Sequence, residues 1–326
     1  MEKLLEVNNL KTYFYTDKGV LPAVDGLDFV LGEGEILAIV GESGCGKSVS
    51  SMCVINMVPP PGKVVDGEIL YLGENILDKS PEQMRDIRGK EISIIFQDPI
   101  SSLNPVFKIG KQLIETMVCH LGISKSEAKN RAIEALGAVG IPDPISFLKK
   151  YPHELSGGMC QRVMIAIALC CDPKILIADE PTTALDVTIQ AQILRLLKTL
   201  REETGTSIIL ITHDMGVVAQ MADRVLVMYA GQAVEEAEVN EIFKNPKHPY
   251  TIGLLDSIPR PDEGEKELYN IKGTVPGVGE YPEGCRFAPR CDRSSPECEK
   301  NPPEYTGRYG HFVRCHRVSW EKEQSS

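Results

Sequence analysis

A chain of 326 residues is longer than one hydrophobic core usually organises, so we expect a large domain with an appendage, or two domains. The net charge of −11 argues against nucleic acid or an anionic lipid surface as the main partner, because both require an excess of Lys and Arg. No apolar run approaches the roughly 18 to 20 residues that cross a bilayer, and MEKLLEVNNLKTY lacks the apolar core of a signal peptide. We therefore expect a cytoplasmic protein, in which disulfides are disfavoured.

The first element with a clear pattern is a short apolar strand at Glu35–Val40, followed by GESGCGKS at residues 41–48 and by a stretch that suits a helix. The octapeptide fits G-x-x-x-x-G-K-[ST] in the strand-to-helix context that makes this pattern specific. Its glycines let backbone N–H groups converge on phosphate oxygens at a helix N-terminus. The pattern predicts that Lys47 reaches the β- and γ-phosphates and that the Ser48 hydroxyl binds Mg²⁺.

Buried strands are predicted at residues 92–96, 174–178 and 207–212, with a helix at residues 186–204. Alternating strands and helices indicate parallel strands joined by crossover helices, which is an α/β core. A helical pattern without strand signals predicts an inserted helical subdomain at about residues 100–165. Two further strands are expected around Ala230-Gly231, and the composition shifts to Pro, Gly and Cys near Asn245, where we place a domain boundary.

Two carboxylates, Asp179 and Glu180, directly follow the strand at residues 174–178. Taken alone, such a pair is usually a solvated turn. Downstream of a phosphate loop, Asp179 is placed to hold Mg²⁺ through its water shell, and Glu180 is placed to polarise an attacking water.

LSGGMCQRV at residues 155–163 makes the pattern more specific. Together with the phosphate loop, Gln97 at a strand end, DEPTTALD at residues 179–186 and THD around His213, it resembles the ATP-binding-cassette ATPases in motif and order. The resemblance implies a P-loop NTPase fold with a RecA-like parallel-sheet core, an antiparallel β subdomain and an inserted helical subdomain. We assign residues 1–245 to this cassette and residues 246–326 to a small Cys-rich C-terminal extension.

The resemblance also implies roles for single residues. Two cassettes meet head to tail in this family, so Ser156, Gly157 and Gly158 would bind the γ-phosphate of ATP held by a partner cassette. Gln97 would sense the γ-phosphate and the metal, Glu180 would act on the water, and His213 would contact the γ-phosphate. The full set of expected ATP and Mg²⁺ contacts within one chain is Phe14 (with Tyr13 as the alternative adenine-stacking residue), Gly41, Ser43, Gly44, Cys45, Gly46, Lys47, Ser48, Val49, Gln97 and Asp179, with Mg²⁺ on Ser48 and Gln97.

One position departs from the family pattern, because related importers commonly have a basic or polar residue where Cys160 stands. Side chains at this position lie beyond the backbone contacts of the Ser-Gly-Gly segment, so we expect the site to function.

Two classes of cassette ATPase remain open: the energising subunit of an importer, and a soluble ATPase of DNA repair or translation. The paired cysteine knuckles of the repair class and the second cassette of the translation class are both missing from this sequence. NPKHPYTIGLLDSIPRP at residues 245–261, followed by GTVPG and GCRFAPRC, resembles the C-terminal extension of dipeptide and oligopeptide importer ATPases. Nickel importers share part of it and are the alternative.

This resemblance implies the partners. They are a second cassette, either a copy or a paralogue, two transmembrane permease subunits and, indirectly, an extracytoplasmic solute-binding protein. No nucleic acid partner is expected. The chain would sit peripherally on the cytoplasmic face of the cell membrane.

Four cysteines gather in the tail: Cys285, Cys291, Cys298 and Cys315. Their spacing, C-x5-C-x6-C-x16-C, lacks the close C-x2-C pairs of structural zinc sites, and four thiolates suit zinc or an iron-sulfur cluster equally. The third hypothesis is that the four cysteines bind no metal. The resemblance favours a 4Fe-4S cluster, with zinc as the alternative, and the Arg residues among the cysteines (286, 290, 293 and 314) would offset its negative charge.

Overall fold

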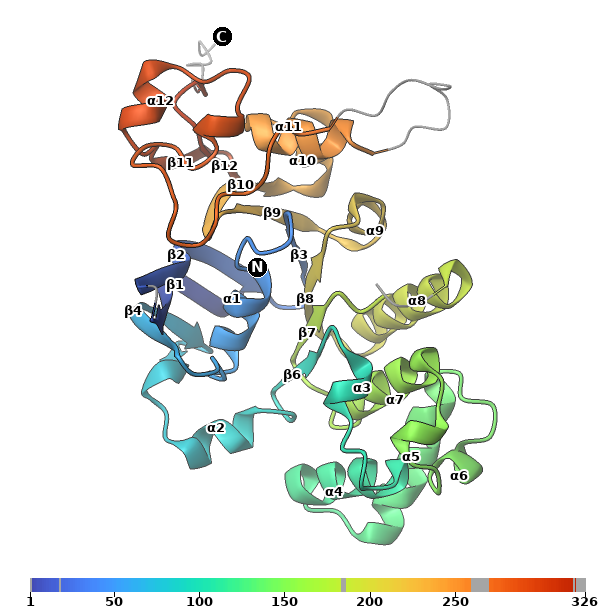
Figure 1. The fold of residues 1–326 in the computed structure, drawn as a ribbon. Helices are drawn as coiled ribbons and strands as arrows, with labels where there is room; N and C mark the ends of the chain where they lie inside the picture. Colours follow the sequence, from blue (N-terminus) through green and yellow to red (C-terminus); the bar gives the residue numbers. More distant parts are fainter. Residues whose placement is uncertain (1, 18, 183–185, 259–269, 319, 321–326) are drawn as a thin grey trace. The chain divides into compact units, whose positions relative to one another are not determined.

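The computed structural model describes residues 2–17, 19–182, 186–258, 270–318 and 320 (Figure 1). The chain divides into two compact units. Unit 1 comprises residues 1–3, 31–36 and 78–211, and unit 2 comprises residues 4–30, 37–77 and 212–326.

Unit 1 contains the parallel strands β6 (Ile92–Ile95), β7 (Ile175–Asp179) and β8 (Ser207–Thr212). The last residue of β8, Thr212, is the first of the third segment of unit 2. Every residue of β7 and β8 is buried, as expected for strands covered on both faces. Helix α8 (Val187–Thr204) connects these two strands, and Asp186 caps it by accepting a hydrogen bond from the Ile189 N–H. The predicted strand–helix alternation is therefore confirmed here.

Most of the remaining helices of unit 1 come between β6 and β7 in the chain order. Helices α4 (Ile109–Leu121), α5 (Lys125–Ala138) and α7 (Gly157–Leu169) pack on one another. Their contacts involve apolar positions such as Leu113, Ala132 and Val163. Ser124 caps α5, and Gly122 ends α4 in the left-handed conformation. The helices are α2 (Pro81–Ile87), α3 (Pro99–Ser102), α4 (Ile109–Leu121), α5 (Lys125–Ala138), α6 (Pro144–Phe147) and α7 (Gly157–Leu169), with a 3₁₀ turn at Pro152–Glu154.

Unit 2 contains an antiparallel sheet in the order β2 (Gly19–Gly32), β1 (Lys3–Thr16), β4 (Gly62–Tyr71) and β5 (Glu74–Asn75), followed by a 3₁₀ turn at Ile76–Asp78. The pairing of β1 with β4 shifts register between Asn8 and Lys11. Such a bulge inserts an extra residue, so the buried positions change from Leu5 and Val7 to Leu10 and Thr12.

A second sheet of unit 2 has the order β11 (Tyr305–Arg308), β12 (His311–Arg314), β10 (Gln232–Glu238), β9 (Arg224–Tyr229) and β3 (Ile36–Val40). β3 pairs with β9 in parallel, and the other pairs are antiparallel. Because β12 pairs with β10 at Glu235 and Val313, the C-terminal extension continues the same sheet. The helices of this unit are α1 (Lys47–Val54), α9 (Met215–Met221), α10 (Val239–Lys244), α11 (Pro249–Asp256) and α12 (Pro296–Lys300), with a 3₁₀ turn at Ala288–Arg290.

The extension buries its apolar side chains in a core that it shares with β9 and α9. The ring of Tyr229 contacts Tyr250 and Phe287 edge to face, with centroids 4.7 Å and 5.2 Å apart. Aromatic pairs of this kind add about 0.5–1.5 kcal/mol each beyond the area they bury. The extension is thus held in place by packing on β9, the strand next to β3.

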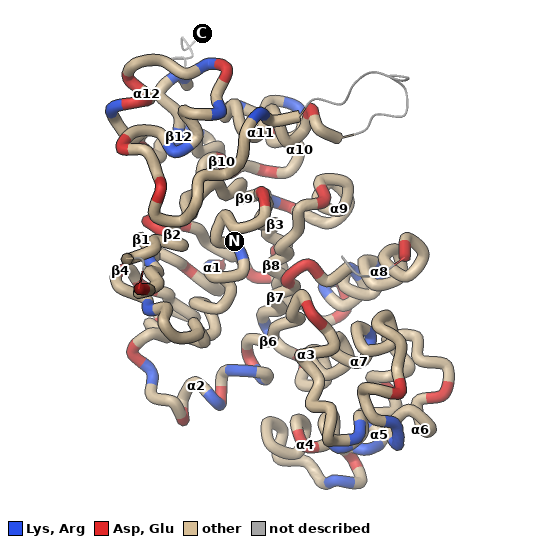
Figure 2. Tube along the Cα trace, viewed as in Figure 1, with Lys and Arg blue, Asp and Glu red and all other residues tan. Residues whose placement is uncertain are grey.

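Figure 2 shows acidic and basic residues interspersed in both units. Among the described residues, no helix combines the length and apolar character needed to span a bilayer.

Candidate nucleotide site and tail cysteines

The phosphate loop lies between β3 and α1 in unit 2, where the backbone passes very close to neighbouring carbonyl groups. A Cβ at Gly41 would lie 2.2 Å from the Met228 carbonyl oxygen, and a Cβ at Gly46 would lie 2.5 Å from the Ala23 carbonyl oxygen. Both glycines also have positive φ angles, 153° and 101°. The local fold therefore requires glycine at these two positions of the motif.

Lys47 holds its amine over the backbone of this loop. The side chain is buried, and Nζ donates to the carbonyl oxygens of Gly41 at 2.8 Å and of Glu42 at 3.0 Å. Ser43, Gly44 and Ser48 are exposed, Val49 is half-buried, and Cys45 is buried with the pKa of its thiol raised by burial. A buried cation beside accessible backbone is suited to bind an anion.

The two aromatic candidates for adenine stacking follow each other on β1. Phe14 pairs with Gly62 of β4, and a Cβ on that glycine would lie 2.7 Å from the Phe14 ring. Tyr13 donates its hydroxyl to the Asp25 carboxylate at 2.9 Å. The Tyr13 hydroxyl is thus engaged in a hydrogen bond within the sheet, whereas the Phe14 ring lies over a glycine.

Unit 1 brings Gln97 and Glu180 together, although they are far apart in sequence. Gln97 Nε2 donates to Glu180 Oε2 at 2.9 Å. Asp179 is buried at the end of β7, and the next residue, Glu180, has a φ angle of 47° with its N–H donated to the Ile211 carbonyl at 2.9 Å. A left-handed backbone at a glutamate is uncommon, and such residues cluster at functional sites. Residues 183–185 of the DEPTTALD segment lie outside the described residues.

Ser156 is the N-cap residue of α7, and Gly157 begins the helix. Within the described part of the chain the Ser156 hydroxyl makes no capping hydrogen bond, unlike that of Ser124 at α5. Cys160 is buried and donates its thiol to the Pro152 carbonyl at 3.6 Å. The residue that departs from the family pattern therefore packs inside the helical subdomain.

His213 is exposed in unit 2, directly after β8. The neighbouring Asp214 fixes the turn, because its carboxylate accepts from the N–H groups of Gly216 and Val217 at the start of α9. The predicted residues thus divide between the units. Gln97, Ser156, Asp179 and Glu180 belong to unit 1, whereas the phosphate loop, Phe14 and His213 belong to unit 2.

Three contacts of the motifs have no signal in the sequence. Gln161 is buried and donates to the Pro181 carbonyl at 2.7 Å, which ties α7 to the segment after β7. Glu42 occupies a variable position of the phosphate-loop pattern, yet it forms an ion pair with Arg290 and donates its N–H to the Tyr250 hydroxyl. These contacts join segments that only the tertiary fold brings together.

The family model described as "ABC transporter" matches residues 24–183. "Oligopeptide transport ATP-binding protein AppD" of Bacillus subtilis is 52% identical over 328 residues and covers 100% of both chains. The chain belongs to the ABC transporter ATPases. "Dipeptide transport ATP-binding protein DppD" of the same organism is 54% identical over 89% of this ABC ATPase and 87% of its own length.

The fold and the extension of this ABC ATPase match known proteins as well. The solved "Dimeric Structure of MJ0796, a Bacterial ABC Transporter Cassette" is 28% identical and superimposes with a TM-score of 0.66, covering 72% of this chain and 98% of that chain. The predicted cassette fold is therefore confirmed. Residues 234–298 match the family model described as "Oligopeptide/dipeptide transporter, C-terminal region".

The four tail cysteines of the ABC ATPase lie near one another in unit 2. Cys285 donates its N–H to the Cys298 carbonyl at 2.7 Å. Burial raises the pKa of the Cys285 thiol, and the adjacent thiols of Cys298 and Cys315 raise it further. Burial likewise raises the pKa of Cys291, with the same two neighbours adding to the effect. Even so, the described residues include no group of three or more His, Cys, Asp or Glu side chains arranged to hold a metal ion.

Two of the arginines expected to offset a cluster's charge are paired elsewhere. Arg286 pairs with Asp25, and Arg290 pairs with Glu42. Arg314 donates to the carbonyl oxygens of Ala233 and Pro303, whereas Arg293 is exposed. The arginines next to Cys285 and Cys291 thus connect the tail to the cassette.

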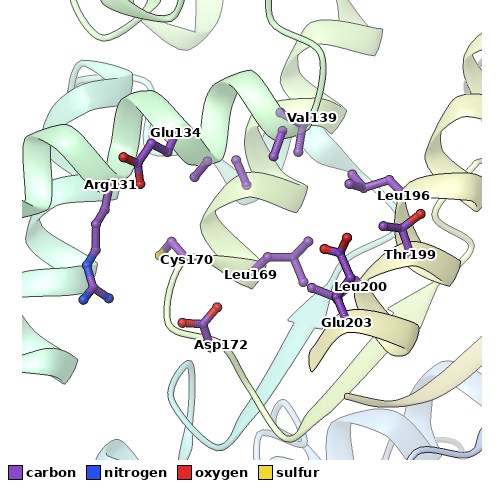
Figure 3. Close-up of a pocket in the computed structure, with 13 residues that line it drawn as sticks. Arg131, Glu134, Val139, Leu169, Cys170, Asp172, Leu196, Thr199, Leu200 and Glu203 are labelled. Atoms are coloured by element: carbon purple, nitrogen blue, oxygen red, sulfur yellow. The ribbon is translucent and has the colours of Figure 1, made fainter. Parts of the chain in front are cut away.

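Unit 1 also contains a cavity of about 500 Å³ between α5, α7 and α8 (Figure 3). None of the described residues predicted to contact nucleotide lines it, so this cavity is separate from the motifs. Its walls combine small apolar side chains with a charged rim and comprise Arg131, Glu134, Ala135, Ala138, Val139, Ala166, Leu169, Cys170, Asp172, Leu196, Thr199, Leu200 and Glu203.

Proposed function

We propose that this ABC ATPase is the nucleotide-binding subunit of a membrane importer for di- and oligopeptides. The observation that carries the proposal is the full-length 52% identity to an oligopeptide transport ATP-binding protein, which includes the C-terminal extension. Nothing in the comparisons favours the nickel or non-transport alternatives, so they become outcomes of the test.

In the proposed mechanism the backbone N–H groups of residues 41–48 cradle the phosphates, and Lys47 neutralises the β- and γ-phosphates. Ser48, Gln97 and Asp179 would hold Mg²⁺, which supplies charge neutralisation in the transition state. Glu180 would orient the attacking water and accept its proton on a carboxylate oxygen, while the Gln97 amide holds that carboxylate in place.

We further propose that the active unit contains two cassettes. Ser156, Gly157 and Gly158 of one chain would bind the γ-phosphate held by the other, and a Ser156 hydroxyl that makes no capping hydrogen bond to α7 supports this role. His213, exposed after β8, would contact the same phosphate. Two permease subunits would anchor the pair at the cytoplasmic face of the membrane, and a solute-binding protein would deliver the peptide.

The direct test is transport by the complex that co-purifies with this chain from solubilised membranes. In proteoliposomes containing this complex, we expect ATP-dependent accumulation of a radiolabelled dipeptide or oligopeptide supplied with its binding protein. The control reaction contains a non-hydrolysable ATP analogue in place of ATP. Uptake of Ni²⁺ without peptide uptake would assign the chain to a nickel importer. Purification of the chain from membranes without any permease subunit would contradict a role in an importer.

We also propose that Cys285, Cys291, Cys298 and Cys315 bind a 4Fe-4S cluster that crosslinks the extension. The resemblance of the extension to that of peptide importer ATPases supports this proposal, and the fold brings two of the four cysteines together, because the Cys285 N–H donates to the Cys298 carbonyl at 2.7 Å. The cluster would act as a structural crosslink, since phosphate chemistry needs no electron transfer.

Metal analysis of protein purified without oxygen checks this assignment. We expect about four irons per chain, as the cluster type requires, and broad visible absorption. Cys298→Ser should lose the iron, whereas the exposed Cys119 of α4 offers a matched control in Cys119→Ser. Stoichiometric zinc would replace the cluster by a zinc site, and protein free of both metals would remove the proposal.

A further inference from the structure

An ion pair joins the phosphate loop to the C-terminal extension within unit 2. Glu42 is the second residue of the loop, and Arg290 ends the 3₁₀ turn next to Cys291. Arg290 Nη1 lies 2.6 Å from Glu42 Oε2, and Nη2 lies 3.0 Å from Oε1. This bidentate geometry is the strongest form of a carboxylate–guanidinium contact.

Arg290 is held firmly on the extension. Its side chain is only 4% exposed, its Nε donates to the Lys272 carbonyl at 2.9 Å, and its Nη2 also donates to the Gly273 carbonyl at 3.3 Å. An arginine guanidinium stays charged throughout the pH range in which proteins are folded. All three guanidinium nitrogens therefore have acceptors, and the guanidinium contacts the phosphate loop at Glu42.

Glu42 is fixed at its backbone as well. Its N–H donates to the hydroxyl of Tyr250 on α11 at 2.8 Å, and its carbonyl accepts from Lys47 Nζ at 3.0 Å. Two of the groups that hold Glu42, the Arg290 guanidinium and the Tyr250 hydroxyl, thus come from beyond residue 245. The groups that hold its carbonyl, Lys47 Nζ and the Cys45 N–H, belong to the motif itself.

A carboxylate in a loop that binds polyphosphate opposes binding, because like charges at short range repel strongly in a partly buried site. Arg290 removes this opposition by neutralising Glu42, whose side chain is 31% exposed. We propose that Arg290 is a positioning residue for the phosphate loop, so that the C-terminal extension sets the nucleotide affinity of the cassette. This inference rests on the proposed binding of ATP by residues 41–48.

Neutralisation of Glu42 by Arg290 and simple stabilisation of the fold by this ion pair predict different effects of mutation. If Arg290 acts by neutralising Glu42, its loss is harmful only while the Glu42 carboxylate is present, and the harm grows with the number of phosphates. If the pair only stabilises the fold, removing either partner has the same effect on every nucleotide.

The test is calorimetric titration of the full chain with MgATP, MgADP and AMP. Arg290→Met should raise the Kd for MgATP about 10-fold, as expected when one partner of a desolvated charge pair is removed, with smaller increases for MgADP and AMP. Adding Glu42→Gln to Arg290→Met should return the Kd for MgATP to within about 3-fold of the parent. Arg293→Met, at an exposed arginine of the same segment, is the matched control and should bind like the parent.

Glu42→Gln alone provides a second, sign-specific readout should Arg290→Met fail to fold. Because this variant leaves the Arg290 charge beside the phosphates, its Kd for MgATP should stay unchanged or fall. A parental Kd in folded Arg290→Met, failure of the double variant to recover, or a 10-fold rise in Glu42→Gln would each overturn the inference. A parent chain that binds no ATP would instead refute the proposed function.

Discussion

Lys47→Ala should abolish measurable ATP binding, raising the Kd at least about 100-fold. The amine is buried and lies over the loop backbone, 2.8 Å from the Gly41 carbonyl. Alanine removes the cation that would neutralise the β- and γ-phosphates, and it also releases the carbonyl groups that this amine holds. The loss therefore combines the missing charge with a less ordered loop. Titration of the full chain with MgATP measures it.

Lys244→Ala is a matched control, since Lys244 is an exposed lysine of α10 in the same unit. It should bind ATP like the parent. Circular dichroism would establish that both variants are folded. A Kd for Lys47→Ala within a few-fold of the parent would show that residues 41–48 do not form the ATP site.

Glu180→Gln should bind ATP normally and hydrolyse it roughly 100 to 10,000 times more slowly, which is the range for loss of a general base. The amide keeps the shape of the side chain, and its oxygen can still accept from Gln97 Nε2. It cannot accept a proton from water. Binding and hydrolysis should therefore separate, with an unchanged Kd and a reduced kcat.

The rate should be measured in the complex with the membrane subunits, because half of each proposed ATP site comes from a second cassette. Glu203→Gln, at an exposed glutamate of α8 in the same unit, is the control and should retain the parental rate. Equal ATPase rates in Glu180→Gln and the parent would remove Glu180 from its assigned role.

Features that depend on neighbouring residues could be predicted from the sequence. The order of strand, glycine-rich loop and helix at residues 35–54 is local, and β3 and α1 form there as expected. The strand ending at Asp179 and the helix capped by Asp186 follow from hydrophobic runs and capping preferences, which act over a few residues. The resemblance to ABC ATPases then assigned roles to Gln97 and Glu180, which the fold places 2.9 Å apart.

The packing of the C-terminal extension could not be predicted from local sequence patterns. Its composition of prolines, glycines and cysteines gave no sign of its packing partners, which are β10, paired with β12, and Tyr229, against which Phe287 packs. The tail has few apolar runs of its own because its partners are residues of the cassette. Its arginines next to Cys285 and Cys291, expected to balance cluster charge, pair with Asp25 and Glu42 instead.

The sequence by itself determined which segments fold into strands and helices, and which motif could bind phosphate, because periodicity and turn chemistry act within a few residues. Only the tertiary structure decided that the loop residue Glu42 meets Arg290, 248 positions away. That contact depends on β9 lying beside β3, and on the extension packing against β9 and joining the sheet at β10. Strand order and packing are properties of the whole unit, and no local pattern encodes them.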